Sequence, residues 1–511
     1  MTKSTTPKVK AQEAMNGKVL QSSIRVSFFL IAASAVLLLC GCSPVGPNYV
    51  RPETTMPDAW HTPLQRGLTE QAMDPNLLAS WWTTLNDPEL TELITRAAVG
   101  NLDVKEARAR VRQARASRAV AEAELFPALN VSGSKMWTRS SSDSGTGETT
   151  HLYSSAFDAG WELDIFGGVR RSIEAADAEY QASEEDLRDV LVTLVSEVAL
   201  NYIEVRTYQT RLATVQENLQ TQTETYQLTD WRCQAGLSDE LAVQQARYSL
   251  ESTRSQVPTL QTGLEEAMNR IAVLLGEQPG SVHANLASGR PMPVLPSDIA
   301  VGVPAETIRR RPDIRRAERE LAAQTAKVGV AAAELYPRFS LNGSIGIEAV
   351  SLNKLAANVS TPSDWVLQGG PQVTWNVFDA GAIRRTINVQ SAIQEQKLIQ
   401  YEAAVLAVLE EVENILVAYA NEHQKNNSLR QAAQAAQQAV ELARFEYEAG
   451  LTDFSNVLEA QRSLLSFQDQ RVESDGTMVS NLIRLYKALG GGWSSLMEVA
   501  QSDINRSVEN K

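Results

Sequence analysis

The side chains best suited to chemistry in this chain of 511 residues are few and widely spaced. No serine-hydrolase elbow, zinc-protease helix, phosphate-binding loop, CxxC pair or calcium-binding loop is present, which argues against a standard enzyme. The histidines follow no metal-ligand spacing. They are His61, His151, His283 and His423. We therefore expect no catalytic residue, no metal site and no cofactor.

Among the three cysteines, Cys42 has surroundings that predict a reaction. A basic stretch and an apolar run over residues 26–39 precede it, in the order of a secretory signal. The sequence Leu39-Cys40-Gly41-Cys42-Ser43 resembles the bacterial lipobox, in which a small residue precedes the modified cysteine. We expect residues 1–41 to be a lipoprotein signal peptide and Cys42 to carry lipid. A plain secretory signal with ordinary cleavage is the alternative.

The rest of the chain gives further expectations about location and partners. By resemblance to Gram-negative lipoproteins, Ser43 after the lipid cysteine favours the outer membrane. The formal charge of -14 argues against nucleic acid as a partner. No segment after the signal peptide reaches 18 apolar residues, so we expect any membrane crossing to be a β-barrel. Cys233 has no partner after processing, and we expect it to pack between helices.

The chain after the N-terminal segment contains an internal sequence repeat of two units. Leu125-Phe126-Pro127 recurs 210 residues later as Leu335-Tyr336-Pro337. Ala235-Gly236-Leu237-Ser238-Asp239 recurs 214 residues later as Ala449-Gly450-Leu451-Thr452-Asp453. Chance does not hold two constant shifts over such a length. The expected parts are an N-terminal lipidated segment 42–80, a first repeat 81–276, a linker 277–304, a second repeat 305–490 and a tail 491–511.

Each repeat reads as a helix, a hairpin, a long helix, a turn and a returning helix. The first helix is expected over about 88–125, with apolar residues at helical spacing. Residues 169–232 and 382–448 lack proline and glycine, which predicts two helices of roughly 90–100 Å with a composition typical of coiled coils. The returning helices are expected over about 239–275 and 453–489. Five prolines predict that the linker is extended.

The hairpin strands alternate between apolar and polar residues. Phe157, Trp161 and Leu163 alternate with Asp158, Glu162 and Asp164, and Val373, Trp375 and Val377 mark the last strand. Long polar loops are expected over 140–150 and 349–364. A soluble sandwich has the same alternation, but an isolated hairpin is not stable, so these strands must pair with other hairpins, including those of other subunits. Apolar-out, polar-in strands with long loops on one side fit a membrane barrel.

Several motifs together resemble the TolC-type outer-membrane efflux proteins. They are Ser80-Trp81-Trp82, Asn86-Asp87-Pro88-Glu89-Leu90, Asn101-Leu102-Asp103, Arg310-Arg311-Pro312-Asp313-Ile314 and the two Gly-Leu-[Ser/Thr]-Asp turns. Cys42 with Pro44-Val45-Gly46-Pro47-Asn48-Tyr49 resembles the lipoprotein branch, the outer-membrane factors of resistance-nodulation-division pumps. The resemblance implies an α+β fold: a long antiparallel α-helical coiled-coil barrel and a membrane β-barrel, with four strands per protomer closed as a trimer.

The same resemblance implies a function without chemistry. The homotrimer is a passive outer-membrane exit duct of a tripartite efflux system, passing small toxic compounds out of the periplasm. A periplasmic adaptor and an inner-membrane pump supply substrate and energy, and outer-membrane lipid surrounds the barrel. Two alternatives stay open: a type I secretion duct for proteins, and a periplasmic scaffold lipoprotein without a channel. The sequence does not identify the substrates.

The resemblance also assigns roles to individual residues. Gly236, Leu237, Gly450 and Leu451 form the two tip turns that dock the adaptor, although a simple helix cap explains either glycine equally well. The strand alternation, rather than the resemblance, predicts that Asp158, Glu162 and Asp164 line the barrel lumen, because an inverted register would place carboxylates against lipid; that inverted register is the alternative. Glu459, with Ser455 and Asn456, forms the pore gate, unless Glu459 is an ordinary solvated residue. Ser455 replaces a bulky apolar plug, and Ala242 and Asn456 replace aspartates, so we expect a looser gate than in relatives.

Overall fold

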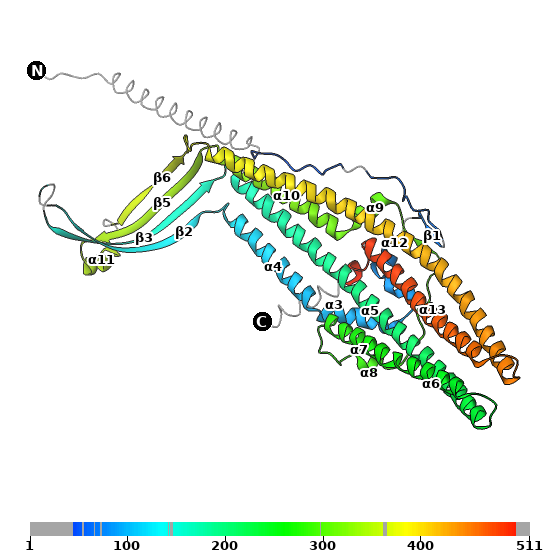
Figure 1. The fold of residues 1–511 in the computed structure, drawn as a ribbon. Helices are drawn as coiled ribbons and strands as arrows, with labels where there is room; N and C mark the ends of the chain where they lie inside the picture. The colour runs from blue at the N-terminus through cyan, green and yellow to red at the C-terminus, as the bar shows by residue number, and fades with distance from the viewer. Residues whose placement is uncertain are drawn as a thin grey trace, which may run out of the picture. The chain divides into compact units, whose positions relative to one another are not determined.

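The computed structural model describes residues 44–53, 56–65, 67–71, 74–141, 143, 147–296, 298–360 and 365–496 (Figure 1). The signal peptide, Cys42 and the tail from residue 497 lie outside these residues. The chain divides into two compact units. The sheet unit joins the chain up to Val50 to residues 115–179 and 321–397. The helical unit joins residues 51–114 and 180–320 to the chain from Leu398.

In the described part of residues 44–277, three short elements precede a series of helices that a hairpin interrupts. The short elements are β1 (Leu68–Thr69), α2 (Pro75–Ala79) and the 3-10 helix η1 (Trp81–Leu85). They are followed by α3 (Pro88–Gly100), α4 (Leu102–Ala123), β2 (Ala128–Arg139), β3 (Thr149–Leu163), α5 (Gly168–Gln234), α6 (Glu240–Arg254) and α7 (Gln256–Leu274).

The second half repeats the order of long helices and paired strands. After α8 (His283–Leu286) and β4 (Ile299–Ala300) come α9 (Pro304–Arg310), α10 (Pro312–Ala333), β5 (Arg338–Ala349), α11 (Leu352–Asn358), β6 (Trp365–Thr374), α12 (Ala382–Glu448) and α13 (Phe454–Ala488). The short helix α11 is added between its strands, and the single helix α13 takes the place of α6 and α7. Both α5 and α12 contain 67 residues. The absence of internal proline lets these helices run about 100 Å each. In the part of the chain described, no helix combines the length and apolar character needed to cross a membrane.

The sheet unit is built on four antiparallel strands in the order β2-β3-β5-β6. The pairing of β2 with β3, of β3 with β5 and of β5 with β6 runs without a bulge. Strands β2 and β6 are therefore free edges of this sheet. The last strand is shorter than expected: β6 ends at Thr374, so Trp375 and Val377, which were expected in the strand, lie beyond it. Residues 349–364, expected as a plain loop, include the short helix α11.

The helix expected over residues 88–125 is two helices, α3 and α4, and Asn101 separates them. The Asn101 Nδ2 donates to the Leu274 carbonyl at 2.9 Å, and its Oδ1 accepts from the Val104 amide at 3.0 Å. A Cβ on Gly100 would lie 2.1 Å from the Leu275 carbonyl oxygen. The close approach of α7 and the cap on α4 together end one helix and start the next.

Two further boundaries differ from the expectation for physical reasons. The returning helix over 239–275 breaks at Ser255, because Pro258 has no amide hydrogen to donate to the Arg254 carbonyl. The linker over 277–304 is not simply extended. It contains α8 and β4, and β4 pairs in parallel with β1, Leu68 opposite Ile299. Apolar residues between its prolines, including Leu286 and Ile299, are buried in the core.

The core of the helical unit gathers around Trp81. Its ring stacks on Tyr486 of α13 with centroids 5.2 Å apart, and Trp82 meets it edge-on at 6.0 Å. Apolar side chains of η1, α3, α5, α7, α12 and α13 surround this pair. The double tryptophan thus joins elements from both halves of the sequence into one core.

A buried polar network ties α5 to the start of α3 and to the linker. Arg206 is fully buried, and its guanidinium bonds the Glu89 carboxylate, the Tyr202 hydroxyl and the Ser288 carbonyl. Burial, followed by the hydrogen bond to Asp87, raises the pKa of the Tyr202 hydroxyl, so that it stays a neutral donor. A buried guanidinium needs such partners, because an unpaired charge in the interior is costly.

We expect Glu89→Ala to destabilise the helical unit by about 3–5 kcal/mol, because it leaves Arg206 buried without its carboxylate. The control is Glu251→Ala, which removes an exposed ion pair with Arg254 and is expected to cost less than about 1 kcal/mol. Denaturant titrations of both variants in one detergent give the free energies of unfolding. Equal losses in the two variants contradict the structural importance of the Arg206 network.

Candidate functional site

The two faces of the four-stranded sheet differ sharply in chemistry. One cross-strand row carries Asn130, Asp158, Ser344 and Gln368 on adjacent strands. Ser132 donates to Asp158 at 2.6 Å, and this face holds a shallow hollow of about 450 Å³ lined by amides, hydroxyls and glycines. Register places Glu162 on the same face, between Ser340 and the edge of the sheet. The predicted alternation therefore extends through all four strands.

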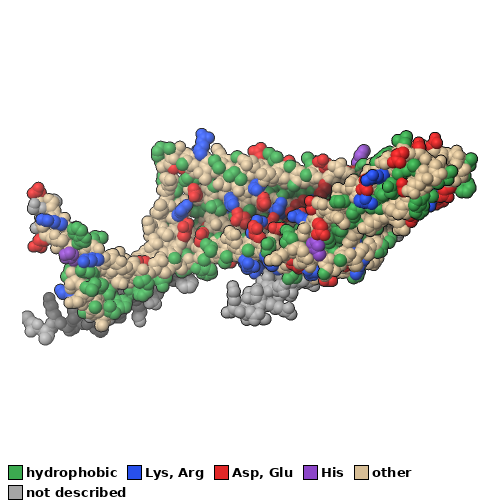
Figure 2. Space-filling model, turned by 60° about the horizontal axis from the view of Figure 1, so that its bottom comes forward, with side chains coloured by type: hydrophobic (Ala, Val, Ile, Leu, Met, Phe, Trp, Pro, Cys, Tyr) green, Lys and Arg blue, Asp and Glu red, His purple; other side chains and the backbone are tan. Residues whose placement is uncertain are grey.

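The opposite face is apolar and exposed on the isolated chain. Its large side chains are Leu129, Val131, Trp137, Phe157, Trp161, Leu341, Ile345, Leu367 and Val373. Figure 2 shows hydrophobic and uncharged side chains over much of the sheet and many more charged ones along the helices. An apolar surface of this extent marks a contact with lipid or with another protein surface.

Asp164 does not belong to the polar sheet face. It lies one residue beyond the end of β3, and its carboxylate accepts from the Val169 and Arg170 amides at 3.1 and 2.9 Å. The Arg170 Nε donates to the same carboxylate at 3.1 Å. Asp164 therefore caps the start of α5, where a carboxylate satisfies free amides and the helix dipole. The alternation that suggested a lumen position ends at Leu163, because the strand ends there.

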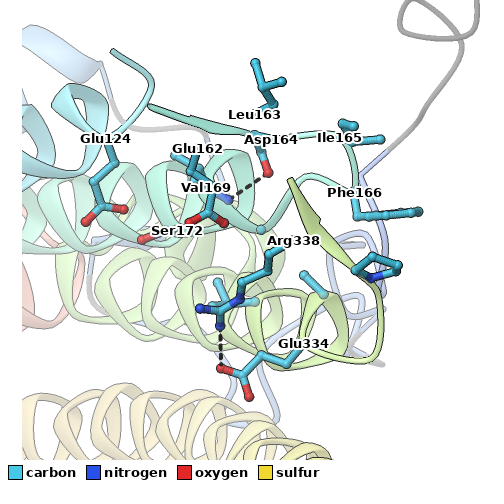
Figure 3. A pocket seen from close by; sticks show the side chains of 14 residues that line it. Glu124, Glu162, Leu163, Asp164, Ile165, Phe166, Val169, Ser172, Glu334 and Arg338 are labelled. Carbon is cyan, nitrogen blue, oxygen red and sulfur yellow. Dashed lines mark hydrogen bonds and ion pairs between the residues drawn. The ribbon is translucent and has the colours of Figure 1, made fainter. Parts of the chain in front are cut away.

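Glu162 also lines a pocket of about 220 Å³ with residues from the adjoining helices (Figure 3). Glu124 and Glu334 contribute two more carboxylates, and Arg338 pairs with Glu334 at 3.4 Å. The pocket thus holds more negative than positive side chains. Sequence reasoning missed Glu124 and Glu334, although the 210-residue shift relates them and could have identified them.

The two tip turns have the same backbone geometry. Gly236 and Gly450 both have φ of +74°. At the first turn, the Gly236 amide donates to the Cys233 carbonyl and the Leu237 amide to the Arg232 carbonyl, which is the Schellman pattern. The same pattern closes the second turn, at Gly450 and Leu451. No atom lies within 4 Å of a Cβ placed on either glycine, so the positive φ alone favours glycine there.

Both tip leucines project into solvent, with 70% of Leu237 and 76% of Leu451 exposed. A small cluster behind them fixes the turns. Its members are Ala242, Ala246, Tyr447, Phe454, Val457 and Leu458. Arg232 lies over the Tyr447 ring at 4.6 Å and donates to the Glu448 carbonyl at 3.4 Å, which joins the first turn to the second. The structure therefore brings the two predicted tip turns together.

The predicted gate residues lie on the first turns of α13. Ser455, Asn456 and Glu459 are exposed, while Val457 and Leu458 between them are buried. Ser455 and Glu459 share one face of the helix at i, i+4 spacing. Asn456 donates to the Thr452 hydroxyl at 2.6 Å and so supports the turn. The isolated chain leaves the Ser455–Glu459 face open to a neighbour or to solvent.

A polar contact between α5 and α13 was not foreseen from the sequence. Arg211 donates to both oxygens of Asp469, at 2.7 and 2.8 Å, and Asn218 donates to Gln468 at 2.9 Å. The first pair is separated by 258 residues, so no local pattern signals it. Bidentate pairing of this kind fixes the register of two neighbouring helices.

The remaining chemistry-bearing residues show no reactive arrangement. The Cys233 sulfur lies 3.9 Å from the Glu240 carboxylate. Partial burial and the nearby acids raise the pKa of its thiol, which disfavours the nucleophilic thiolate. Among the described residues, no group of histidine, cysteine and acidic side chains could hold a metal ion.

Comparison with known proteins places this architecture. The family model "Outer membrane efflux protein" matches residues 93–277 and again residues 303–491. Nodulation protein T of Rhizobium leguminosarum bv. trifolii is 33% identical, over 90% of this chain and 96% of that protein. The cation efflux system protein CusC of Escherichia coli K12 is 30% identical, over 91% of this chain and 99% of that protein.

Solved structures agree in fold. The outer-membrane channel OprN has a TM-score of 0.82 and 34% sequence identity, covering 88% of this chain and 99% of that one. A CusC structure has a TM-score of 0.75 and 28% identity, with 88% of this chain and all of the other covered. Because the family model spans most of the chain and relatives above 30% identity match nearly end to end, the chain belongs to the outer membrane efflux protein family.

Proposed function

We propose that this chain forms the outer-membrane exit duct of a tripartite efflux system. Relatives carry names such as "Toluene efflux pump outer membrane protein TtgC" and "Pyoverdine export outer membrane protein OpmQ", which support that role. A periplasmic adaptor and an inner-membrane pump supply the substrate and the energy. The duct itself performs no reaction and uses no cofactor. Because these relatives export chemically different cargo, we assign small toxic compounds only as a class.

The observation that carries the proposal is a sheet that is open at both edges. Strands β2 and β6 each have one unpaired side, and one face is apolar. Exposed edges and a wide apolar face are unstable in water, whereas a closed barrel in lipid satisfies both. Three copies joined edge to edge make a twelve-stranded barrel with the apolar face toward lipid. The polar face with Asp158 and Glu162 then lines the lumen.

The helices of the sheet unit have open edges as well. Arg118 of α4 pairs with Asp177 of α5 at 2.9 Å, and Lys327 of α10 pairs with Glu179 of α5 at 2.6 Å. Gln324 of α10 donates to Gln390 of α12 at 2.8 Å, which places the helices in the order α4-α5-α10-α12. The two outer helices expose Val120 and Val389. The same ring of three copies covers both edges and forms the helical tunnel.

We also propose that the two halves of the chain are copies of one ancestral unit. The family model matches once in each half, and the order of the long helices and paired strands is the same in both. The two halves also share their helix ends. A glycine with φ of +74° or +75° follows each of α5, α7, α12 and α13, namely Gly236, Gly276, Gly450 and Gly490. A duplicated unit gives a trimer sixfold pseudosymmetry, which suits a closed ring.

Single-channel recording tests the duct and the lumen face together. Purified protein in planar bilayers is expected to form stable channels as heat-modifiable trimers. In a Cys233→Ser background, Glu162→Cys channels are expected to lose conductance when a bulky water-soluble thiol reagent is added, because that side chain faces the lumen. Leu163→Cys is the matched control and is expected to be insensitive. Absence of channels supports a scaffold lipoprotein, and block of the Leu163→Cys channel supports the inverted register.

The tip turns are proposed to dock the adaptor. Leu237→Asp combined with Leu451→Asp is expected to preserve trimers and to abolish adaptor cross-linking, because burying each leucine supplies about 1.5–3 kcal/mol that an aspartate forfeits. Efflux should fall more than about tenfold, since 1.4 kcal/mol already changes an equilibrium by that factor. Val294→Asp, an equally exposed apolar residue of the linker, is the control. Normal cross-linking of the tip variant contradicts the docking assignment.

The resting duct is proposed to narrow at Glu459, supported by Ser455 and Asn456. In a trimer, three carboxylates near the axis repel one another and attract cations. Glu459→Ala, with or without Ser455→Ala, is expected to raise single-channel conductance and to admit large antibiotics such as vancomycin into cells. Glu473→Ala removes the same charge from an exposed site further along α13 and serves as the control. Unchanged conductance in the Glu459 variants removes this residue from the gate.

A further inference from the structure

Residues 44–50, which we call the N-terminal strap, bind to the sheet unit through several directed contacts. We call the residues that make these contacts the seat of the strap. The strap begins two residues after Cys42, the proposed lipid site. The Val45 amide donates to the Phe166 carbonyl at 3.0 Å, at the junction between β3 and α5. Tyr49 packs among Ala178, Ala322 and Ala323. The strap is thus held at both of its ends.

One guanidinium binds the middle of the strap. Arg171 of α5 is 3% exposed, and its Nε donates to the Val45 carbonyl at 3.1 Å. Its Nη2 lies 2.6 Å from the Asn48 Oδ1, 3.3 Å from the Gly46 carbonyl and 3.5 Å from the Pro44 carbonyl. The Nη1 donates to Glu174 at 2.6 Å. Without the strap, this buried cation would keep Glu174 alone among these partners, which is unfavourable.

Glycines in the strap and in the sheet unit let the strap backbone, α10 and Arg171 lie this close together. A Cβ on Gly46, where φ is +91°, would lie 2.5 Å from Gly329 of α10. A Cβ on Gly167 would lie 2.6 Å from Pro44, and one on Gly329 would lie 2.9 Å from Arg171. Each of these distances is too short for a side chain. Three separate positions therefore lack a Cβ where the strap, α10 and Arg171 meet.

The other half of the chain shows that these features are not general to the fold. The residue 214 positions after Arg171 is Arg385, which is exposed. The residue 210 positions before Gly329 is Ala119. The seat thus combines a buried arginine with a glycine opposite it, whereas the equivalent positions hold an exposed arginine and an alanine. On the isolated chain, the seat around Arg171 is therefore not repeated at those equivalent positions.

We propose that Arg171 binds the N-terminal strap and holds it against the sheet unit. The segment that follows the lipid anchor is then rigidly attached to the folded chain and is not a flexible linker. Two residues span at most about 7 Å, so acyl chains on Cys42 would start beside the β3–α5 junction. Anchoring then holds that junction at the membrane surface. The proposal rests on lipid attachment at Cys42, but the seat itself is a property of the folded chain.

Hydrogen–deuterium exchange of the strap amides in purified trimers tests this proposal. In the wild type, exchange of the Val45 amide is expected to be slow, and equally slow in Cys42→Ala. In Arg171→Ala it is expected to accelerate at least about tenfold, as for a locally opened segment. Arg171→Lys should behave in the same way, because one ammonium cannot replace the planar fork. Arg385→Ala, at the equivalent position of the second half, is the matched control and should leave exchange unchanged.

Two further measurements separate the possible failures. Gly46→Val keeps Arg171 but blocks the seat, so it should also release the strap; unchanged β3 exchange in the same samples shows that the fold is intact. Persistent protection in both Arg171→Ala and Gly46→Val overturns the proposal. Loss of protection in Cys42→Ala also overturns it, because the lipid would then order the strap. Mass spectrometry of the N-terminal peptide reports lipid attachment independently, so its absence contradicts the anchor and not the seat.

Discussion

The rest of this structure depends on one constraint: a sheet that is apolar on one face and open at both edges cannot persist in water. Every backbone group on the outer sides of β2 and β6 needs a partner, and the apolar face needs lipid or protein. Neither the loops nor the helices of the described chain provide them. In the proposed duct, identical copies and outer-membrane lipid provide both. In that proposed ring of three copies, the polar face with Asp158 and Glu162 is the wetted inner surface of the sheet.

The helical unit answers a different requirement. Long helices with narrow apolar stripes gain little from burial along most of their length. Stability is concentrated where elements of both halves meet, around Trp81 and in the Arg206 network. Toward the tips, the single large core gives way to small separate apolar clusters, and polar contacts such as Arg211–Asp469 between them fix helix register. Small separate clusters open at lower cost than one large core, which is consistent with the gate proposed near Glu459.

Periodicity alone predicted much of this fold. The boundaries of α12 agree with the proline- and glycine-free stretch from which it was expected, and the alternation in β3 identified the correct polar face. The failures have two causes, namely contacts between residues distant in sequence and local capping or proline effects that override the periodic pattern. Asn101 divides a helix because α7 approaches Gly100, and Asp164 leaves the strand pattern to cap α5. The seat around Arg171 was equally invisible, although the motif of the strap itself had been noticed.

The hollow on the polar sheet face has a mechanical consequence. Two adjacent cross-strand rows contain Ala128, Gly160, Asn342 and Gly370 in one and Leu129, Ala159, Gly343 and Gly369 in the other. Small residues thus form a belt across all four strands, while the pairing contains no bulge that could bend them. Glycines in strands permit the sharp coiling that bulky side chains resist. In the proposed barrel, this belt is where the four strands can bend most easily.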